Sequence, residues 1–184
     1  GDVVAGAGGQ HLDVVLGGAT EAVQAAMLFL DLDHFKDVND SRGHDAGDEL
    51  LRRAAARLQA CVPAGAILAR QGGDEFAIVL PQADEAAACA VASGAIDALR
   101  QVFRLQGSEH VLGASVGIAL SPDHGRSREE LMRCADVALY AAKAAGRGQF
   151  RVFSTALDVD ARQRVQLLAE LRHALKPLST APSA

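Results

Sequence analysis

The chain has 184 residues, 49% of them hydrophobic, which is enough to bury the core of one domain. A net charge of -5 gives no basic surface for nucleic acid or an anionic membrane, and apolar runs such as residues 25–30 are too short to cross a bilayer. Three cysteines without metal-ligand spacing, and no secretory signal, lead us to expect a soluble, cytoplasmic protein.

The first elements follow a glycine-rich start. Residues 1–19 carry six glycines and a weak apolar pattern, which predicts a loop and a frayed helix, and we treat them as an arm outside the domain. Residues 27–31 form a short apolar run that ends in an acid, as in a buried strand whose last residue emerges at the sheet edge. Helical spacing of apolar residues then predicts a helix over about residues 46–60, with Asp45 as its N-cap.

A hairpin is predicted in the middle of the chain. Short strands over residues 67–70 and 76–80 flank a Gly-Gly-Asp sequence, and glycine pairs supply the positive φ angles that tight turns require. We expect the chain to reverse at Gly72 and Gly73.

Helices and strands alternate after the hairpin. The spacing predicts a helix over residues 85–102, a strand over 111–120, a helix from the capping box of Ser127 and Glu130 to about residue 145 with Gly146 as its stop, and a strand over 150–153. Together with the hairpin, this order predicts an α/β (α+β) fold with a mixed central sheet of about five strands flanked by helices.

The C-terminal part differs in composition. Val165, Leu168, Leu171 and Leu175 lie on one stripe of a predicted helix over residues 157–175, which we interpret as a connector following a domain of residues 20–156. Residues 176–184 are rich in Pro, Ser and Ala, which predicts a disordered tail.

Acidic residues gather where the first strand and the hairpin are expected. Asp31 and Asp33 are two residues apart in a strand, so their side chains share one face while Leu32 points the other way. If the hairpin pairs beside this strand, at a spacing of about 4.8 Å, Asp74 would lie close to Asp31. Such oxygen ligands suit Mg²⁺ or Mn²⁺ bound jointly with substrate phosphates. Acids in a hairpin are more often solvated turn residues, so this spacing alone leaves both interpretations open.

Four motifs stand in order along the chain. They are Asp31-Leu-Asp-His-Phe-Lys-Asp-Val-Asn39-Asp, Gly43-His-Asp-Ala-Gly-Asp48, Arg70-Gln-Gly-Gly-Asp-Glu-Phe76 and Lys143-Ala-Ala-Gly-Arg147. Together they resemble the signature of the GGDEF diguanylate cyclase family over roughly residues 27–153. The resemblance implies a fold like that of nucleotidyl cyclases and polymerase palms, with GGDEF at a β-hairpin. It also implies the condensation of two GTP into cyclic di-GMP with release of two pyrophosphates.

The resemblance implies a metal site and two catalytic carboxylates. Asp31, the backbone carbonyl of Leu32 and Asp74 would hold the metal, and Asp74 and Glu75 would be the catalytic residues. Asp74 is the candidate base for the 3′-hydroxyl, although a metal that lowers the pKa of this hydroxyl would supply much of the activation.

The same match implies the substrate contacts. Asn39 and Asp48 match the guanine contacts, and a carboxylate can accept from the N1 and N2 hydrogens of guanine. The other implied contacts are His44, the phosphate-loop residues Phe35 and Lys36, the hairpin glycines Gly72 and Gly73, and the cations Lys143 and Arg147 for the terminal phosphates. Taken alone, Lys143 and Arg147 would be interpreted as surface cations four residues apart on one helix face near its C-terminus, and His44 as a turn residue.

The chain departs from the family pattern at two places. The family's opening motif is eroded, since only Asp2 and Gly6 of residues 2–10 match it. The Arg-x-x-Asp site of product inhibition is replaced by Pro63 and Ala66, so we expect no inhibitory binding of product there.

The partners implied by the resemblance are a second copy and further domains. One domain holds one GTP, so two copies must meet face to face in a homodimer. Residues 167–175 resemble the helix that leads into an EAL phosphodiesterase domain in tandem GGDEF-EAL proteins, which implies a C-terminal EAL domain and an upstream sensory domain. A second function therefore stays open: a catalytically weak GTP-binding regulatory module that controls the adjacent EAL phosphodiesterase. The intact acids argue against a purely structural domain.

Overall fold

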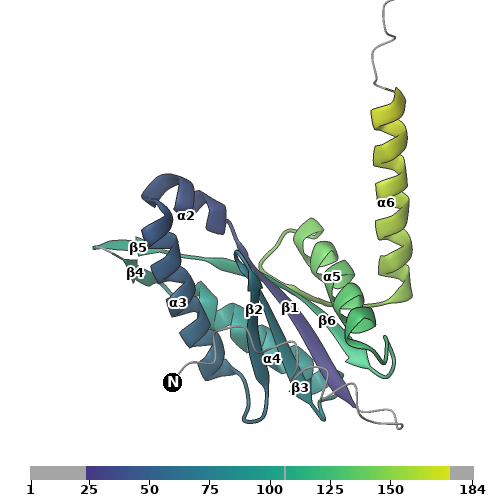
Figure 1. The fold of residues 1–184 in the computed structure, drawn as a ribbon, viewed down its shortest axis with the longest axis horizontal. Helices are drawn as coiled ribbons and strands as arrows, with labels where there is room; N and C mark the ends of the chain where they lie inside the picture. Colours follow the sequence, from purple (N-terminus) through teal and green to yellow (C-terminus); the bar gives the residue numbers. More distant parts are fainter. Residues whose placement is uncertain (1–23, 106, 175–184) are drawn as a thin grey trace, which may run out of the picture.

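The computed structural model describes residues 24–105 and 107–174 (Figure 1). Its elements in chain order are β1 (Ala25–Asp33), α2 (Phe35–Arg42), α3 (His44–Cys61), β2 (Ile67–Gly72), β3 (Glu75–Pro81), α4 (Glu85–Arg100), β4 (Phe103–Leu105), β5 (Ser108–His110), β6 (Gly113–Ser121), α5 (Arg128–Ala144), β7 (Phe150–Val152) and α6 (Thr155–Ala174). The predicted N-terminal arm and disordered tail lie outside the described residues, and the division into a domain of residues 20–156 and a connector stays a prediction.

A mixed five-stranded sheet forms the centre of the fold, in the order β2-β3-β1-β6-β7. The middle strand β1 pairs antiparallel with β3 and with β6, while β7 joins β6 in parallel. The sheet and its helices confirm the predicted α+β class. Because β1 is the central strand, its C-terminal residues lie between the hairpin on one side and β6 on the other.

Alternation along β1 decides which side chains meet which helices. Leu28, Leu30 and Leu32 pack with α3 and α4, whereas Met27 and Phe29 pack with α5 on the other face. By the same alternation the next odd residues, Asp31 and Asp33, point to the face that carries α5. This is why α5, a helix much further along the chain, can supply Lys143 as a partner for Asp31.

The approach of α5 to the sheet depends on a glycine of β6. A Cβ at Gly117 would lie 1.9 Å from the carbonyl oxygen of Ala135 and 2.3 Å from the backbone nitrogen of Leu139. Both atoms belong to the backbone of α5, so the helix sits where any side chain at Gly117 would be. The capping box predicted at Ser127 and Glu130 starts this helix, with both reciprocal hydrogen bonds formed.

Three local features differ from the predictions. The short helix α2 is absent from them, because only Phe35 and Val38 of its eight residues are buried. The small β4–β5 ribbon is also absent from them, since each strand has three residues. The predicted N-cap Asp45 is wrong: α3 begins at His44 with Gly43 at the cap, and Asp45 lies in the first turn.

The helix α6 leaves the end of the sheet and projects away from it (Figure 1). It contacts α5 near its start, where Asp158 pairs with Arg133 at 3.2 Å, and Leu168 and Leu171 of the predicted apolar stripe are exposed. Leu175 and the side chain of Val165 lie outside what the structure describes. Across the described ranges, no helix combines the length and the apolar character needed to cross a membrane.

Candidate active site

The hairpin acids lie beside the end of β1. Glu75 is opposite Asp31 in the antiparallel register, and the backbone N–H of Leu32 donates to the Asp74 carbonyl at 3.2 Å. The sheet thus brings together the two acids that the sequence predicted to be neighbours. Both Asp74 and Glu75 are half-buried, whereas Asp31 is buried.

The turn itself differs slightly from the prediction. The chain reverses at Gly73 and Asp74 instead of at Gly72 and Gly73, because the ladder shifts register between Arg70 and Gly72. Gly73 has φ 49°, a left-handed conformation that glycine adopts at little cost. Nε of the Arg70 guanidinium donates to the Gly73 carbonyl at 2.9 Å, which stabilises the hairpin turn.

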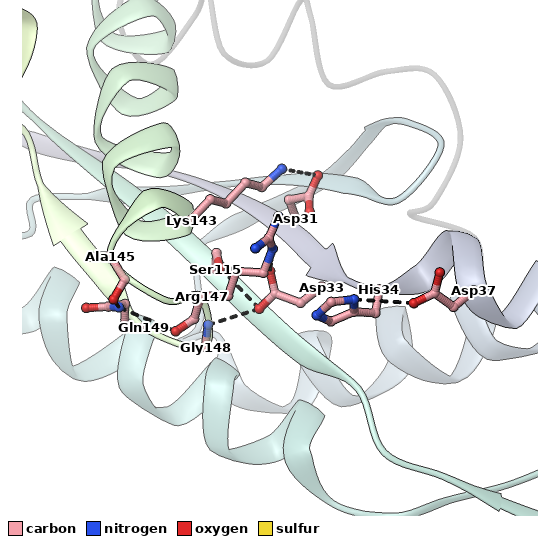
Figure 2. Close-up of polar contacts among 10 residues, drawn as sticks. All are labelled: Asp31, Asp33, His34, Asp37, Ser115, Lys143, Ala145, Arg147, Gly148 and Gln149. Carbon is pink, nitrogen blue, oxygen red and sulfur yellow. Dashed lines mark hydrogen bonds and ion pairs between the residues drawn. The ribbon is translucent and has the colours of Figure 1, made fainter. Parts of the chain in front are cut away.

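A single helix cation enters the acidic cluster. Figure 2 shows Lys143 of α5 reaching Asp31, with Nζ 2.8 Å from Oδ2. Burial raises the pKa of the Asp31 carboxyl; Lys143 opposes this rise, and Asp74 and Asp33 add to it. Burial also raises the pKa of Glu75, with Asp31 and Asp74 as further causes. The carboxylates of this cluster therefore repel one another, and one ammonium compensates them in part.

The donor set of this cluster fits a divalent cation shared with a substrate. Asp31, Asp74 and the Leu32 carbonyl are hard oxygen donors, the type that Mg²⁺ and Mn²⁺ prefer. Within residues 24–105 and 107–174, no three His, Cys, Asp or Glu side chains form a group that could hold a metal by themselves. Two carboxylates that leave the remaining positions to phosphates match the usual way in which proteins bind Mg²⁺.

The second acid of β1 is committed to internal hydrogen bonds. Asp33 is 4% exposed, accepts from Oγ of Ser115 at 2.8 Å, and accepts from the backbone N–H of Gly148 at 3.0 Å (Figure 2). It shares the α5 face with Asp31, as the strand alternation predicts. Its oxygens are already used by the protein, so Asp33 is a structural acid in the centre of the site.

Arg147 lies past the end of its helix. α5 ends at Ala144, and Arg147 adopts a left-handed φ of 62°, so the prediction that Lys143 and Arg147 share one helix face is wrong. The Nε atom of Arg147 is 4.0 Å from Oδ1 of Asp33, and its side chain is half exposed. The turn therefore presents the guanidinium beside the acids with room to meet a ligand.

The predicted guanine contacts form a second group on α2 and α3. Asn39 is half-buried on α2, while His44 and Asp48 are exposed in the first turns of α3. The backbone N–H of Gly43 donates to the Asn39 carbonyl at 2.9 Å, which ties the two helices together.

Two further predicted residues open α2. Phe35 and Lys36 are its first two residues and directly follow the turn after β1; Phe35 is buried and Lys36 is exposed. The N-terminal backbone amides of this helix, rather than those of an irregular loop, therefore stand at the end of the central strand. His34 makes this turn with a left-handed φ of 64°.

Comparison with known proteins decides the family. A family model described as "Diguanylate cyclase, GGDEF domain" matches residues 9–149. The chain belongs to the GGDEF family. The crystal structure of the GGDEF domain of YfiN, also called TpbB, from Pseudomonas aeruginosa has a TM-score of 0.75 and 38% identity, covering 79% of this chain and 92% of that one.

Curated relatives of this GGDEF domain are longer proteins. MucR of Pseudomonas aeruginosa, a bifunctional diguanylate cyclase/cyclic di-GMP phosphodiesterase, is 42% identical over 151 residues, which are 82% of this chain and 22% of MucR. PdeR of Escherichia coli, a cyclic di-GMP phosphodiesterase, is 41% identical over 153 residues, which are 83% of this chain and 23% of PdeR. The chain thus spans about a fifth of the length of these relatives.

The GGDEF hairpin also borders a hollow. Glu75 and Lys143 line a cavity of about 240 Å³ together with Asp136, Tyr140 and residues of α5 and α6. Neither Asn39 nor Asp48 lines this cavity. The cavity therefore lies beside Glu75 and Lys143 and not beside the predicted guanine contacts. Asp136 and Tyr140 are exposed at its edge.

Some residues that shape this GGDEF site were missed by sequence reasoning. Gly47 lies so close to Asn39 that a Cβ would stand 1.9 Å from its Oδ1, and Ser115 and Arg100 bind groups around the Arg147 turn. Gly47 stands inside the second motif, which was a usable signal. Ser115 and Arg100 carry no local signal, because only the fold brings them to their partners.

The positions of the family's product-inhibition site form part of a turn. Pro63 and Ala66 lie between α3 and β2, where the Ala66 N–H donates to the Pro63 carbonyl at 3.1 Å. Neither side chain carries a charge or a polar group that could pair with guanine or phosphate.

Proposed function

We propose that this GGDEF domain is a diguanylate cyclase that condenses two GTP into cyclic di-GMP. The observation that supports this most is the cluster of Asp31, Asp74 and Glu75 at the end of the central strand, with Lys143 as counter-charge. Carboxylates gathered in a half-buried site at the end of a strand are suited to bind cations together with phosphates.

The residues of the acid side have distinct tasks in this proposal. Asp31, the Leu32 carbonyl and Asp74 hold Mg²⁺ or Mn²⁺, which when bound polarises the phosphate and lowers the pKa of the attacking hydroxyl. Asp74 and Glu75 stand beside that hydroxyl as candidate acceptors of its proton.

The other residues orient the nucleotide. The first amides of α2, at Phe35 and Lys36, face the phosphates, since the N-terminus of a helix favours anions. Lys143 and Arg147 bind the terminal phosphates. Gly72 and Gly73 have no side chain, so the nucleotide can approach the backbone closely there. The Asp48 carboxylate accepts hydrogen bonds from guanine, and the Asn39 amide pairs with the guanine edge. His44 lies near the substrate.

The reaction joins two such half-sites. The 3′-oxygen of one GTP attacks the α-phosphorus of the other, the bond to the pyrophosphate oxygen breaks, and the hydroxyl proton leaves to a carboxylate or water. The second attack closes the ring, and two pyrophosphates are released in total. Each domain holds one GTP, so two copies must face each other about a two-fold axis.

A second candidate function shares the same site. The chain is 40% identical over 131 residues to TpbB of Pseudomonas aeruginosa, named a diguanylate cyclase, but it is also 41% identical over 153 residues to PdeR, named a phosphodiesterase. A GTP-binding module that controls an EAL domain beyond α6 would use the same Asn39, Asp48 and Lys143. Both candidates bind GTP, so only turnover separates them.

The test is therefore a turnover assay. The chain is fused to a dimeric coiled coil and incubated with GTP and Mg²⁺, and cyclic di-GMP is quantified by chromatography. Product from the parent, and none from an Asp74→Ala control, supports the cyclase. GTP binding without product in the dimerised parent contradicts it and favours the regulatory module.

Guanine recognition gives a separate prediction at Gly47. In Gly47→Ala the new methyl would overlap the Asn39 side chain, which can swing aside because it is the end of a flexible group, and it would lie 3.2 Å from Cζ of the buried Phe35. This crowding opposes the gain in helix propensity from glycine to alanine. We expect GTP binding to weaken by about tenfold, the order of one lost polar contact, with the thermal midpoint nearly unchanged. Isothermal titration calorimetry and a thermal melt measure the two quantities. Unchanged GTP affinity would remove Asn39 from the proposed guanine site.

A further inference from the structure

The turn that carries Arg147 has an unfavourable backbone. Gly146, Arg147 and Gly148 all have positive φ angles, of 118°, 62° and 60°. An arginine in the left-handed region costs conformational energy and persists when neighbouring groups fix it. The groups that fix this turn therefore decide where the Arg147 guanidinium stands.

Gly148 is held on both sides of its backbone. Its N–H donates to Oδ2 of Asp33 at 3.0 Å, and its carbonyl accepts from Nη2 of Arg100 at 2.5 Å. The Asp33 side is rigid, because this buried carboxylate also accepts from Ser115 in the centre of the sheet (Figure 2). We name this pair of contacts, from Asp33 and from Arg100, the Gly148 clamp.

Arg100 reaches the clamp from the opposite layer of the fold. It is the last residue of α4, the helix that packs on the sheet face away from α5. Its side chain is half exposed, and its contact with Asp97 is long, at 3.9 Å. A Cβ at Gly148 would lie 3.0 Å from the Arg100 Nη2, so the guanidinium is packed closely against the turn. None of the four motifs contains Arg100.

We propose that Arg100 is a positioning residue for phosphate binding: by clamping Gly148 against Asp33 it fixes the turn that presents Arg147 to the terminal phosphates. The inference rests on the proposed function, because it takes Arg147 as a phosphate contact. Arg100 itself points its guanidinium at a backbone carbonyl, so it acts through Arg147 and does not touch the nucleotide.

The first test compares two nucleotides on the full chain. Arg100→Gln is expected to weaken GTP binding about three- to tenfold, the effect of one hydrogen bond. GMP binding should not change, because GMP lacks the terminal phosphates. The control is Arg104→Gln, which removes a more exposed arginine whose side chain pairs with Glu109. Combined with Arg147→Ala, Arg100→Gln should cause no further loss, because its effect passes through Arg147. Equal weakening of GTP and GMP, or additive losses, would overturn the proposal.

The second test needs no nucleotide. Hydrogen exchange of the Gly148 amide, which donates to Asp33, should be faster in Arg100→Gln than in the parent and unchanged in Arg104→Gln. Unchanged exchange in Arg100→Gln overturns the clamp even if the parent does not bind GTP. Failure of the parent to bind GTP, with faster exchange in the variant, would instead overturn the proposed function and with it the role of the clamp in phosphate binding.

Discussion

Asp31→Asn is expected to abolish cyclic di-GMP formation while leaving the fold at least as stable as that of the parent. Asparagine keeps the shape of the side chain but removes the charge that pairs with Lys143 at 2.8 Å and would hold the divalent cation. Loss of a metal contact in the transition state removes several kcal/mol, so we expect turnover to fall by about 10³-fold or more.

The expected stability of this variant follows from the pKa of Asp31. Burial raises this pKa despite the pairing with Lys143, so the folded state disfavours the ionised carboxyl. A carboxyl whose pKa is higher in the folded state than in the unfolded chain lowers the free energy of unfolding once the pH rises above the pKa of the unfolded chain. A neutral amide cannot ionise, so Asp31→Asn removes this destabilisation. Urea unfolding at neutral pH measures it. The control Asp160→Asn, at an exposed acid of α6, should retain turnover. Normal product formation by Asp31→Asn would contradict the proposed metal site.

Gly117→Ala is expected to lower the free energy of unfolding by roughly 3 kcal/mol or more, the upper range for overpacking. The added methyl would lie 1.9 Å from the Ala135 carbonyl oxygen, and that atom cannot turn away as a side chain could. Relief requires the whole of α5 to move off the sheet. This movement would also withdraw Lys143 from Asp31, so binding of GTP should weaken in whatever fraction stays folded.

Gly94 provides a matched control for that substitution. It lies inside α4, and a Cβ there would meet nothing within 4 Å. Gly94→Ala should raise the free energy of unfolding by about 0.5–1 kcal/mol, because alanine favours a helix interior over glycine. Urea unfolding of both variants gives the comparison. A Gly117→Ala variant as stable as the parent would show that α5 does not depend on the close approach at β6.

The long elements could be predicted from the sequence because each carries its own signal. The apolar run of β1 and the capping box of α5 are local patterns, and the structure has both. The helix α2 has no such signal: it buries two of eight residues and depends on its contacts with α3. The strands β4 and β5 have three residues each, too few for an alternation of apolar and polar residues to indicate a strand.

The site could be predicted only where one strand pairing determined it. Placing the hairpin beside β1 was enough to bring Asp74 to Asp31, since the register follows from two short elements. The partners of Asp33 could not be foreseen, because Ser115 and Gly148 come from two other segments and depend on the register of β6 and on the path of the chain after α5. The left-handed conformation of Arg147 also depends on the path of the chain after α5.

The contact between Lys143 and Asp31 makes the binding of cation and nucleotide interdependent. Under the proposed function, the ammonium occupies a carboxylate that a divalent ion also requires, so either ligand must displace a bond of 2.8 Å within the protein. Terminal phosphates offer Lys143 an alternative partner and so free Asp31, and by thermodynamic linkage the cation must strengthen nucleotide binding by the same factor. Under the proposed function, the domain without nucleotide is therefore compensated in part by its own ammonium, and we expect it to bind free cations weakly until nucleotide arrives.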